Sequence, residues 1–151
     1  MAFQDFLNNL KQKASELKTE AMKFKNKDFL NAAVSGSVLI SMADGLVSSD
    51  EKQKMMRFIE NYEALSVFSS HEIIESFQNI MSQIEFDKDL GEAKAYDAIR
   101  KMKGKDDAAR LIMRLIIAIA GADGKFDDSE KRVARKIAME LALNPADFEL
   151  V

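Results

Sequence analysis

An acidic phrase occurs twice in this chain, once in each half, and it restricts the fold more than any other feature. The first copy, residues 42–52, reads MADGLVSSDEK, and the second, residues 121–131, reads GADGKFDDSEK. Each copy keeps Ala-Asp-Gly, an apolar residue two positions after the glycine, and a closing Glu-Lys. Asp44 and Asp123 lie 79 residues apart, and apolar positions on both sides of the phrase coincide at that offset. The repeat therefore predicts two helix–turn–helix units with rough internal two-fold symmetry.

The rest of the chain also has the apolar periodicity of helices. Apolar residues recur at spacings of three and four, and the 151 residues contain only one proline and six glycines. The pattern predicts one long helix over residues 3–24, a second helix over residues 29–43 that Asp28 caps, and a linker over residues 85–91. The most apolar helix begins at Asp106, and we expect it to be the centre of the bundle.

Three capping boxes mark predicted helix starts, because Ser48, Ser69 and Asp127 each stand three residues before a glutamate. Gly45 and Gly124 are predicted to end the helices before them. No strand alternation or hairpin turn appears. We therefore predict an all-α, single-domain bundle of about seven helices. Its two parts would be an amphipathic basic helix in residues 1–27 and a helical domain in residues 28–151.

Composition and charge narrow the possible functions. The chain has no cysteine and a single histidine, His71, so a bound metal is expected to be a hard cation on oxygen ligands. Residues 1–27 carry a net charge of +3 and the remainder −6, and without a further basic stripe we expect no nucleic-acid partner. Residues 1–10 lack a signal-peptide core, and the apolar stretch 111–122 is shorter than the roughly 20 residues of a membrane span. A cytoplasmic location is therefore expected.

Each acidic phrase matches the later half of a calcium-binding EF-hand loop, with Asp-Gly followed by a glutamate six residues after the glycine. The earlier ligand positions hold Ile119 and Gly121 in the second copy, which excludes a complete EF-hand. Two half-loops could still supply one divalent cation, Ca²⁺ or a similar ion, or form two weak sites. The predicted ligands are Asp44, Glu51, Asp123 and Glu130, with Asp127, Asp128 and Asp50 as auxiliary oxygens.

A purely structural interpretation competes with the metal site. Glu51 and Glu130 are the third residues of capping boxes, where glutamate binds backbone amides. Asp44 and Asp123 fit this interpretation less well, because a carboxylate at a helix C-terminus faces the negative end of the helix dipole. The sequence leaves open whether the two turns lie together or at opposite ends of the fold.

The N-terminal helix has an apolar face flanked by lysines, and its first turns contribute Phe3, Phe6, Leu7 and Leu10. This face could pack on the bundle, contact an anionic membrane or bind a partner protein. His71 is expected on the surface, the methionines in the core, and no catalytic constellation is recognised.

The chain resembles the TerB family of bacterial tellurite-resistance proteins over nearly its whole length. The similarity is carried by the lysine-rich N-terminal helix and by the segments ISMADGLVSSDEK and LIIAIAGADGKFDDSEK. The resemblance implies an all-helical, non-enzymatic cytoplasmic protein of a stress-resistance operon, with a proposed role in metal binding through Asp44, Glu51, Asp123 and Glu130. It also implies association with the integral membrane protein TerC and other operon proteins at the inner membrane.

Chemistry limits what such a protein can do with tellurite. A chain without cysteine cannot reduce tellurite through thiols, and clustered carboxylates would repel the anion. The leading hypothesis is therefore a cation-binding module, and the alternative is a helical scaffold in a membrane-associated resistance complex without a direct metal role.

Overall fold

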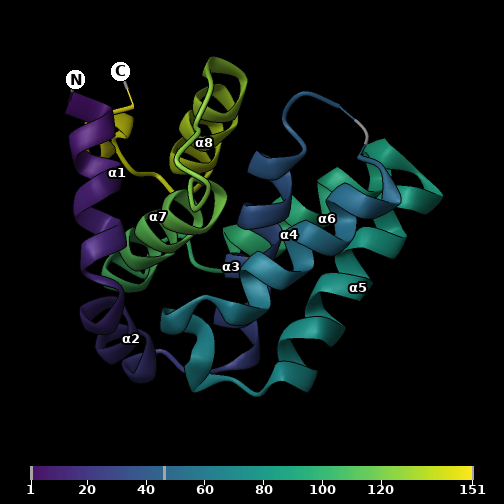
Figure 1. The fold of residues 1–151 in the computed structure, drawn as a ribbon, viewed down its shortest axis with the longest axis horizontal. Helices are drawn as coiled ribbons and strands as arrows, with labels where there is room; N and C mark the ends of the chain where they lie inside the picture. Colours follow the sequence, from purple (N-terminus) through teal and green to yellow (C-terminus); the bar gives the residue numbers. More distant parts are fainter. Residues whose placement is uncertain (1, 46, 151) are drawn as a thin grey trace.

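The computed structural model describes residues 2–45 and 47–150, and Figure 1 shows their arrangement. These residues form α-helices and two short 3₁₀ helices, without a strand, which confirms the predicted all-α class. The elements are α1 (Ala2–Gln12), α2 (Ala14–Lys23), α3 (Lys27–Ser41), α4 (Ser49–Asn61), η1 (Glu63–Val67), α5 (Ser70–Phe86), α6 (Lys88–Arg100), α7 (Asp106–Ala120), α8 (Asp128–Glu140) and η2 (Pro145–Phe148).

Two helices rather than one form the centre of the bundle. The α7 helix is buried along most of its length, as its apolar sequence predicts, and α3 is equally buried beside it. The two helices approach closely at Gly36, where a Cβ atom would lie 2.8 Å from Cγ2 of Ile116. Glycine at this position therefore permits the contact that holds the two halves of the molecule together.

The other helices cover this central pair. Helices α5 and α6 pack against α3 and against each other, and α8 contacts α3, α6 and α7. On the other side, α1 and α2 lie along α7, and α2 also packs on η1 (Figure 1). Each repeat unit contains one central helix, because α3 leads into α4 and α7 leads into α8.

The predicted helix starts agree with the structure at all three capping boxes. Three other predictions were wrong. The long first helix breaks at Lys13, Asn26 rather than Asp28 caps α3, and residues 85–91 are not a linker. In that last region Asp87 ends α5 and caps α6 directly, so that two helices meet with no loop between them.

The apolar face of α1 packs onto the bundle. Phe3, Leu7 and Leu10 are buried, and Phe6 is partly buried against the ring of Phe148, with centroids 6.4 Å apart. The suggestion that this face is open to a membrane or a partner therefore does not hold for this structure, because α7 and its neighbours already cover it. Among the described residues, no helix combines the length and apolarity needed to cross a bilayer.

Candidate functional site

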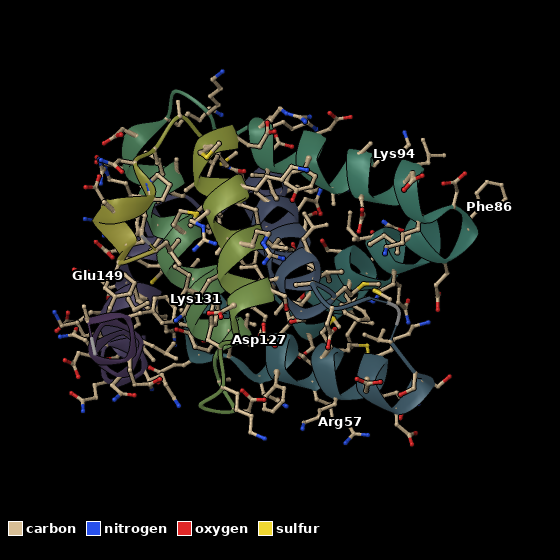
Figure 2. The ribbon with its side chains drawn as sticks, turned by 90° about the horizontal axis from the view of Figure 1, so that it is seen from above. Arg57, Phe86, Lys94, Asp127, Lys131 and Glu149 are labelled. Atoms are coloured by element: carbon tan, nitrogen blue, oxygen red, sulfur yellow. The ribbon has the colours of Figure 1, made fainter. Side chains whose placement is uncertain are left out.

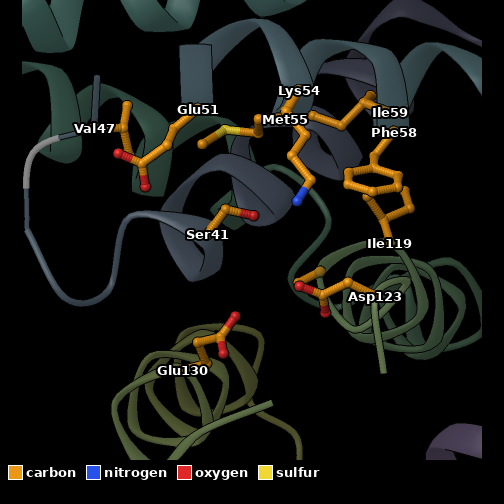
Figure 3. Close-up of a pocket in the computed structure, with 11 residues that line it drawn as sticks. Ser41, Val47, Glu51, Lys54, Met55, Phe58, Ile59, Ile119, Asp123 and Glu130 are labelled. Carbon is orange, nitrogen blue, oxygen red and sulfur yellow. The ribbon is translucent and has the colours of Figure 1, made fainter. Parts of the chain in front are cut away.

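A pocket of about 190 Å³ lies between the two acidic turns, and side chains from both repeat units line it (Figure 3). It lies where α3 and α7 end and where α4 and α8 begin. Its floor is apolar and its rim carries carboxylates. The lining residues are Ser41, Val47, Glu51, Lys54, Met55, Phe58, Ile59, Ile119, Ala120, Asp123 and Glu130. The structure thus brings the two turns together at one end of the fold, a choice that the repeat alone left open.

Two of the four predicted ligands also cap helices. The Oε1 atom of Glu51 accepts a hydrogen bond from the backbone N–H of Ser48 at 3.1 Å, and that of Glu130 accepts one from Asp127 at 2.9 Å. The structural interpretation of these glutamates is therefore correct. Capping occupies only one oxygen of each carboxylate, since the described residues make no hydrogen bond to Oε2 of Glu51 or of Glu130.

Glu130 differs electrostatically from the other capping glutamates. Hydrogen bonds from the serine at the N-cap lower the pKa of Glu51, and likewise that of Glu72 in the capping box of α5. In Glu130, burial raises the pKa to about 7, and the nearby charges of Asp127, Asp123 and Asp44 add to this rise although the hydrogen bond from Asp127 opposes it. Glu130 is thus a half-buried carboxyl among acidic neighbours.

The two turn aspartates lie on the exposed rim of the site. Oδ1 of Asp123 accepts a hydrogen bond from the backbone N–H of Lys125 at 3.0 Å, which folds the turn back on itself. Gly45 and Gly124 follow the aspartates with φ angles of 128° and 83°, a region that favours glycine. Asp44 does not line the pocket, but it lies close enough to raise the pKa of Glu130.

The predicted auxiliary acids lie outside the pocket lining. Asp127 is the N-cap of α8, and its Oδ1 accepts hydrogen bonds from the backbone of Glu130 at 2.9 Å and the hydroxyl of Ser129 at 2.7 Å. Those bonds lower the pKa of Asp127 and keep it in its capping role. Asp128 and Asp50 are exposed in the first turns of α8 and α4, where the helix dipole favours acidic residues.

The donor chemistry of this site fits a hard cation, because carboxylate oxygens from two turns face one space. The arrangement is nevertheless open. Across residues 2–45 and 47–150, no three acidic or histidine side chains are gathered closely enough to hold a metal ion as they stand. Closing such a site would require the carboxylates to turn inward from their present positions.

The sequence interpretation missed the apolar and basic lining of the pocket. Lys54 and Phe58 stand three and seven residues after Glu51, so helical spacing puts all three on one face of α4. That spacing is visible in the sequence, but only the packing of α4 against the second turn shows that this face lines a pocket. His71, whose side chain is 85% exposed, does not line this pocket, and its Nε2 is 3.4 Å from a carboxylate oxygen of Glu75 on α5.

Comparison with known proteins places these features in a family. A family profile described as "Tellurite resistance protein TerB" matches residues 30–151. A curated relative from Alcaligenes sp, "Tellurium resistance protein TerB", is 35% identical over 100 residues, which cover 66% of this chain and 82% of that protein. No solved structure gives a significant match. The matched region contains both acidic turns, most of α3 and all of α4, α7 and α8, and the chain belongs to the TerB family of tellurite resistance proteins.

Proposed function

We propose that this protein is a non-enzymatic component of a bacterial tellurite- and stress-resistance system that binds a divalent cation between its two acidic turns. Asp44, Glu51, Asp123 and Glu130 would hold the ion, and Ca²⁺ is the ion to which the half-loop spacing points. Its charge would offset the mutual repulsion of carboxylates drawn from the two halves of the chain.

The observation that carries this proposal is that the carboxylates of Glu51, Asp123 and Glu130, drawn from both repeat units, line one pocket (Figure 3). The raised pKa of Glu130 supports it. The same capping geometry lowers the pKa of Glu51 and Glu72, whereas Glu130 has a pKa raised to about 7. Burial and three acidic neighbours cause the difference. A carboxyl in such surroundings binds either a proton or another cation, and a divalent ion stabilises several carboxylates at once.

The same charges argue against direct binding of tellurite. The rim of the pocket presents three carboxylates and one ammonium group, and an oxyanion would be repelled by that excess of negative charge. We therefore place the contribution of this protein to resistance in sensing or buffering a cation and not in converting the tellurite anion.

The test is a titration with CaCl₂ followed by calorimetry and by backbone amide NMR. We expect saturable shifts at the four proposed ligands. Glu51→Gln should weaken Ca²⁺ binding about tenfold or more, because one carboxylate facing the ion is lost.

Glu72→Gln is the matched control. Glu72 caps α5 through a hydrogen bond of 2.9 Å from Ser69, as Glu51 caps α4, but it does not line this pocket. The glutamine should leave Ca²⁺ affinity unchanged. Equal effects of the two substitutions, or no saturable shift in the parent at millimolar Ca²⁺, would contradict the proposed site.

The second candidate is a scaffold that docks an integral membrane protein such as TerC, at the inner membrane, without a metal role. The observation that favours it is the junction of α5 and α6, where Phe86 is 85% exposed and points away from the molecule (Figure 2), and where Leu90 is 48% exposed. Capture of TerC should then be lost in Phe86→Ser and retained in Asp123→Asn with Glu130→Gln. The opposite pattern would tie the partner to the acidic turns.

A further inference from the structure

A lysine from the first repeat unit lies inside the acidic pocket. Lys54 stands one turn after Glu51 on α4, and it is the one basic residue among the side chains that line the pocket. In Figure 3 its ammonium group points into the space between the two acidic turns, with Glu51 on one side and Asp123 on the other. The charge of Lys54 contributes to the lowered pKa of Glu51.

This ammonium group is held loosely. Its Nζ lies 5.7 Å from the centroid of the Phe58 ring, a cation–π contact, and in the described part of the chain it forms no ion pair with a carboxylate. Lys54 is also exposed. A long, flexible side chain without an ion pair can leave the pocket, and the attraction between its ammonium group and the acidic rim that is then lost opposes the binding of a cation.

We propose that Lys54 is a tethered counter-ion of the acidic pocket, which has to swing out before a divalent cation binds and which thereby sets the affinity of the site. This inference rests on the proposed cation site. It also accounts for the open arrangement of the carboxylates. The ammonium group lies among them and offsets part of their negative charge, so three of them do not have to converge on one point.

The competition follows from charge and from chemistry. An ammonium group donates hydrogen bonds and accepts none, so it can neither ligate the ion nor remain beside it without repulsion. A single positive charge about 6 Å from a divalent ion opposes binding by roughly tenfold in affinity even at the dielectric constant of water. The effect is screened by salt and is best measured at low ionic strength.

The experiment measures the dissociation constant for CaCl₂ by calorimetry at low ionic strength in the full chain and in three variants. Lys54→Met removes the charge and keeps an apolar stem, and Lys54→Arg retains the charge. Arg57→Met removes one positive charge from the same helix at an exposed position outside the pocket lining (Figure 2). A second readout follows the ¹³Cε and ¹Hε signals of Lys54 during the titration.

We expect Lys54→Met to bind Ca²⁺ about tenfold more tightly than Arg57→Met, with Lys54→Arg close to the parent. The Lys54 side-chain signals should move toward those of a freely solvated lysine as Ca²⁺ saturates the site.

Equal affinities of Lys54→Met and Arg57→Met would overturn the role of Lys54 and leave the cation site standing. A Lys54→Met variant that binds Ca²⁺ more weakly than Arg57→Met would also overturn the role of Lys54 as a competitor, because it would show that Lys54 supports cation binding. If neither the parent nor Lys54→Met binds Ca²⁺, both the inference and the proposed function fail.

Discussion

Glu130 makes the stability of this protein depend on pH. Its pKa is about 7 in the folded chain against the ordinary value of 4.5, so the folded state holds the proton more tightly than the unfolded state does. For a carboxyl with a raised pKa, the unfolded state loses its proton first as the pH rises. Glu130 therefore stays mostly neutral in the fold up to about pH 7. Its contribution to stability is complete below pH 4.5 and declines between pH 4.5 and about 7.

We predict that Glu130→Gln flattens this decline. Glutamine keeps the side-chain oxygen that accepts the hydrogen bond from Asp127 and removes the charge that burial and acidic neighbours oppose. At pH 8 the variant should be more stable than the parent by on the order of 1–2 kcal/mol, allowing for solvent screening, and at pH 4 the two should be alike. Urea unfolding at both pH values measures the difference.

Glu72→Gln is the control for this prediction too. The pKa of Glu72 is lowered in the fold, so its charged form stabilises the protein, and the substitution should not increase stability at pH 8. A Glu130→Gln variant that is no more stable than the parent at pH 8 would show that the environment of Glu130 does not raise its pKa.

The sequence predicts the capping role of Glu130 but not its protonation. A capping box is local, because the residues that bond lie three positions apart. The acidic surroundings are not local, since Asp44 belongs to the other repeat unit. Only the packing of the two units shows that their carboxylates influence each other.

At the scale of elements, the junction of α5 and α6 depends on Gly91. A Cβ atom at this residue would lie 2.4 Å from the backbone N and Cα of Ile84, because Asp87 turns the chain so tightly that α6 starts against the end of α5. Backbone atoms cannot move aside as the end of a side chain can.

We predict that Gly91→Ala destabilises the protein by about 1–3 kcal/mol or more, as overpacking does in a close contact. The control is Gly104→Ala. Gly104 has open space around its Cβ position, and its φ of 85° makes alanine unfavourable by about 1 kcal/mol through backbone strain alone. Urea unfolding of both variants gives the comparison. A Gly91→Ala variant that is no less stable than Gly104→Ala would mean that opening the junction costs no more than the backbone strain at Gly104.

The errors in predicting elements have a common physical cause. The linker predicted over residues 85–91 ends at Gly91, whereas Gly91 lies inside α6 at a close approach of two helices. The break at Lys13 was missed because the apolar stripe continues through it. The break lets α1 follow α7 while α2 turns to η1, and this depends on tertiary packing that local periodicity does not contain.

At the scale of the whole molecule, the two repeat units have the same order of helix, turn and helix, but different parts of the chain pack against them. The apolar residue after the second turn, Phe126, packs against Phe3 of α1 with ring centroids 4.9 Å apart, whereas its counterpart Val47 lines the acidic pocket. Nζ of Lys131 lies over the Phe3 ring, 4.9 Å from its centroid. The sequence predicts the repeat, but it does not predict that α1 covers the second turn.

This cover makes the N-terminal helices part of the fold even though the family similarity begins at residue 30. Leu7 contacts the start of the second turn, where a Cβ atom on Gly121 would lie 2.7 Å from its Cδ1, and Leu10 and Leu17 are buried as well. Burying each such side chain stabilises a protein by about 1.5–3 kcal/mol. A domain boundary between residues 27 and 28 would allow the N-terminal helices to move independently as a basic arm. These leucine side chains would then not be buried.

We therefore predict that a variant lacking residues 2–23 unfolds about 10 °C or more below the full chain, because the apolar surface of α7 and η1 becomes exposed. It should also bind an apolar dye that the full chain does not bind. The matched control replaces the exposed lysines Lys11 and Lys13 by glutamine, which changes the charge of the same segment and keeps its apolar contacts. Thermal unfolding followed by circular dichroism distinguishes the two. If the shortened chain unfolds at the same temperature as the full chain, α1 and α2 are a separable arm, and the second acidic turn keeps its shape without them.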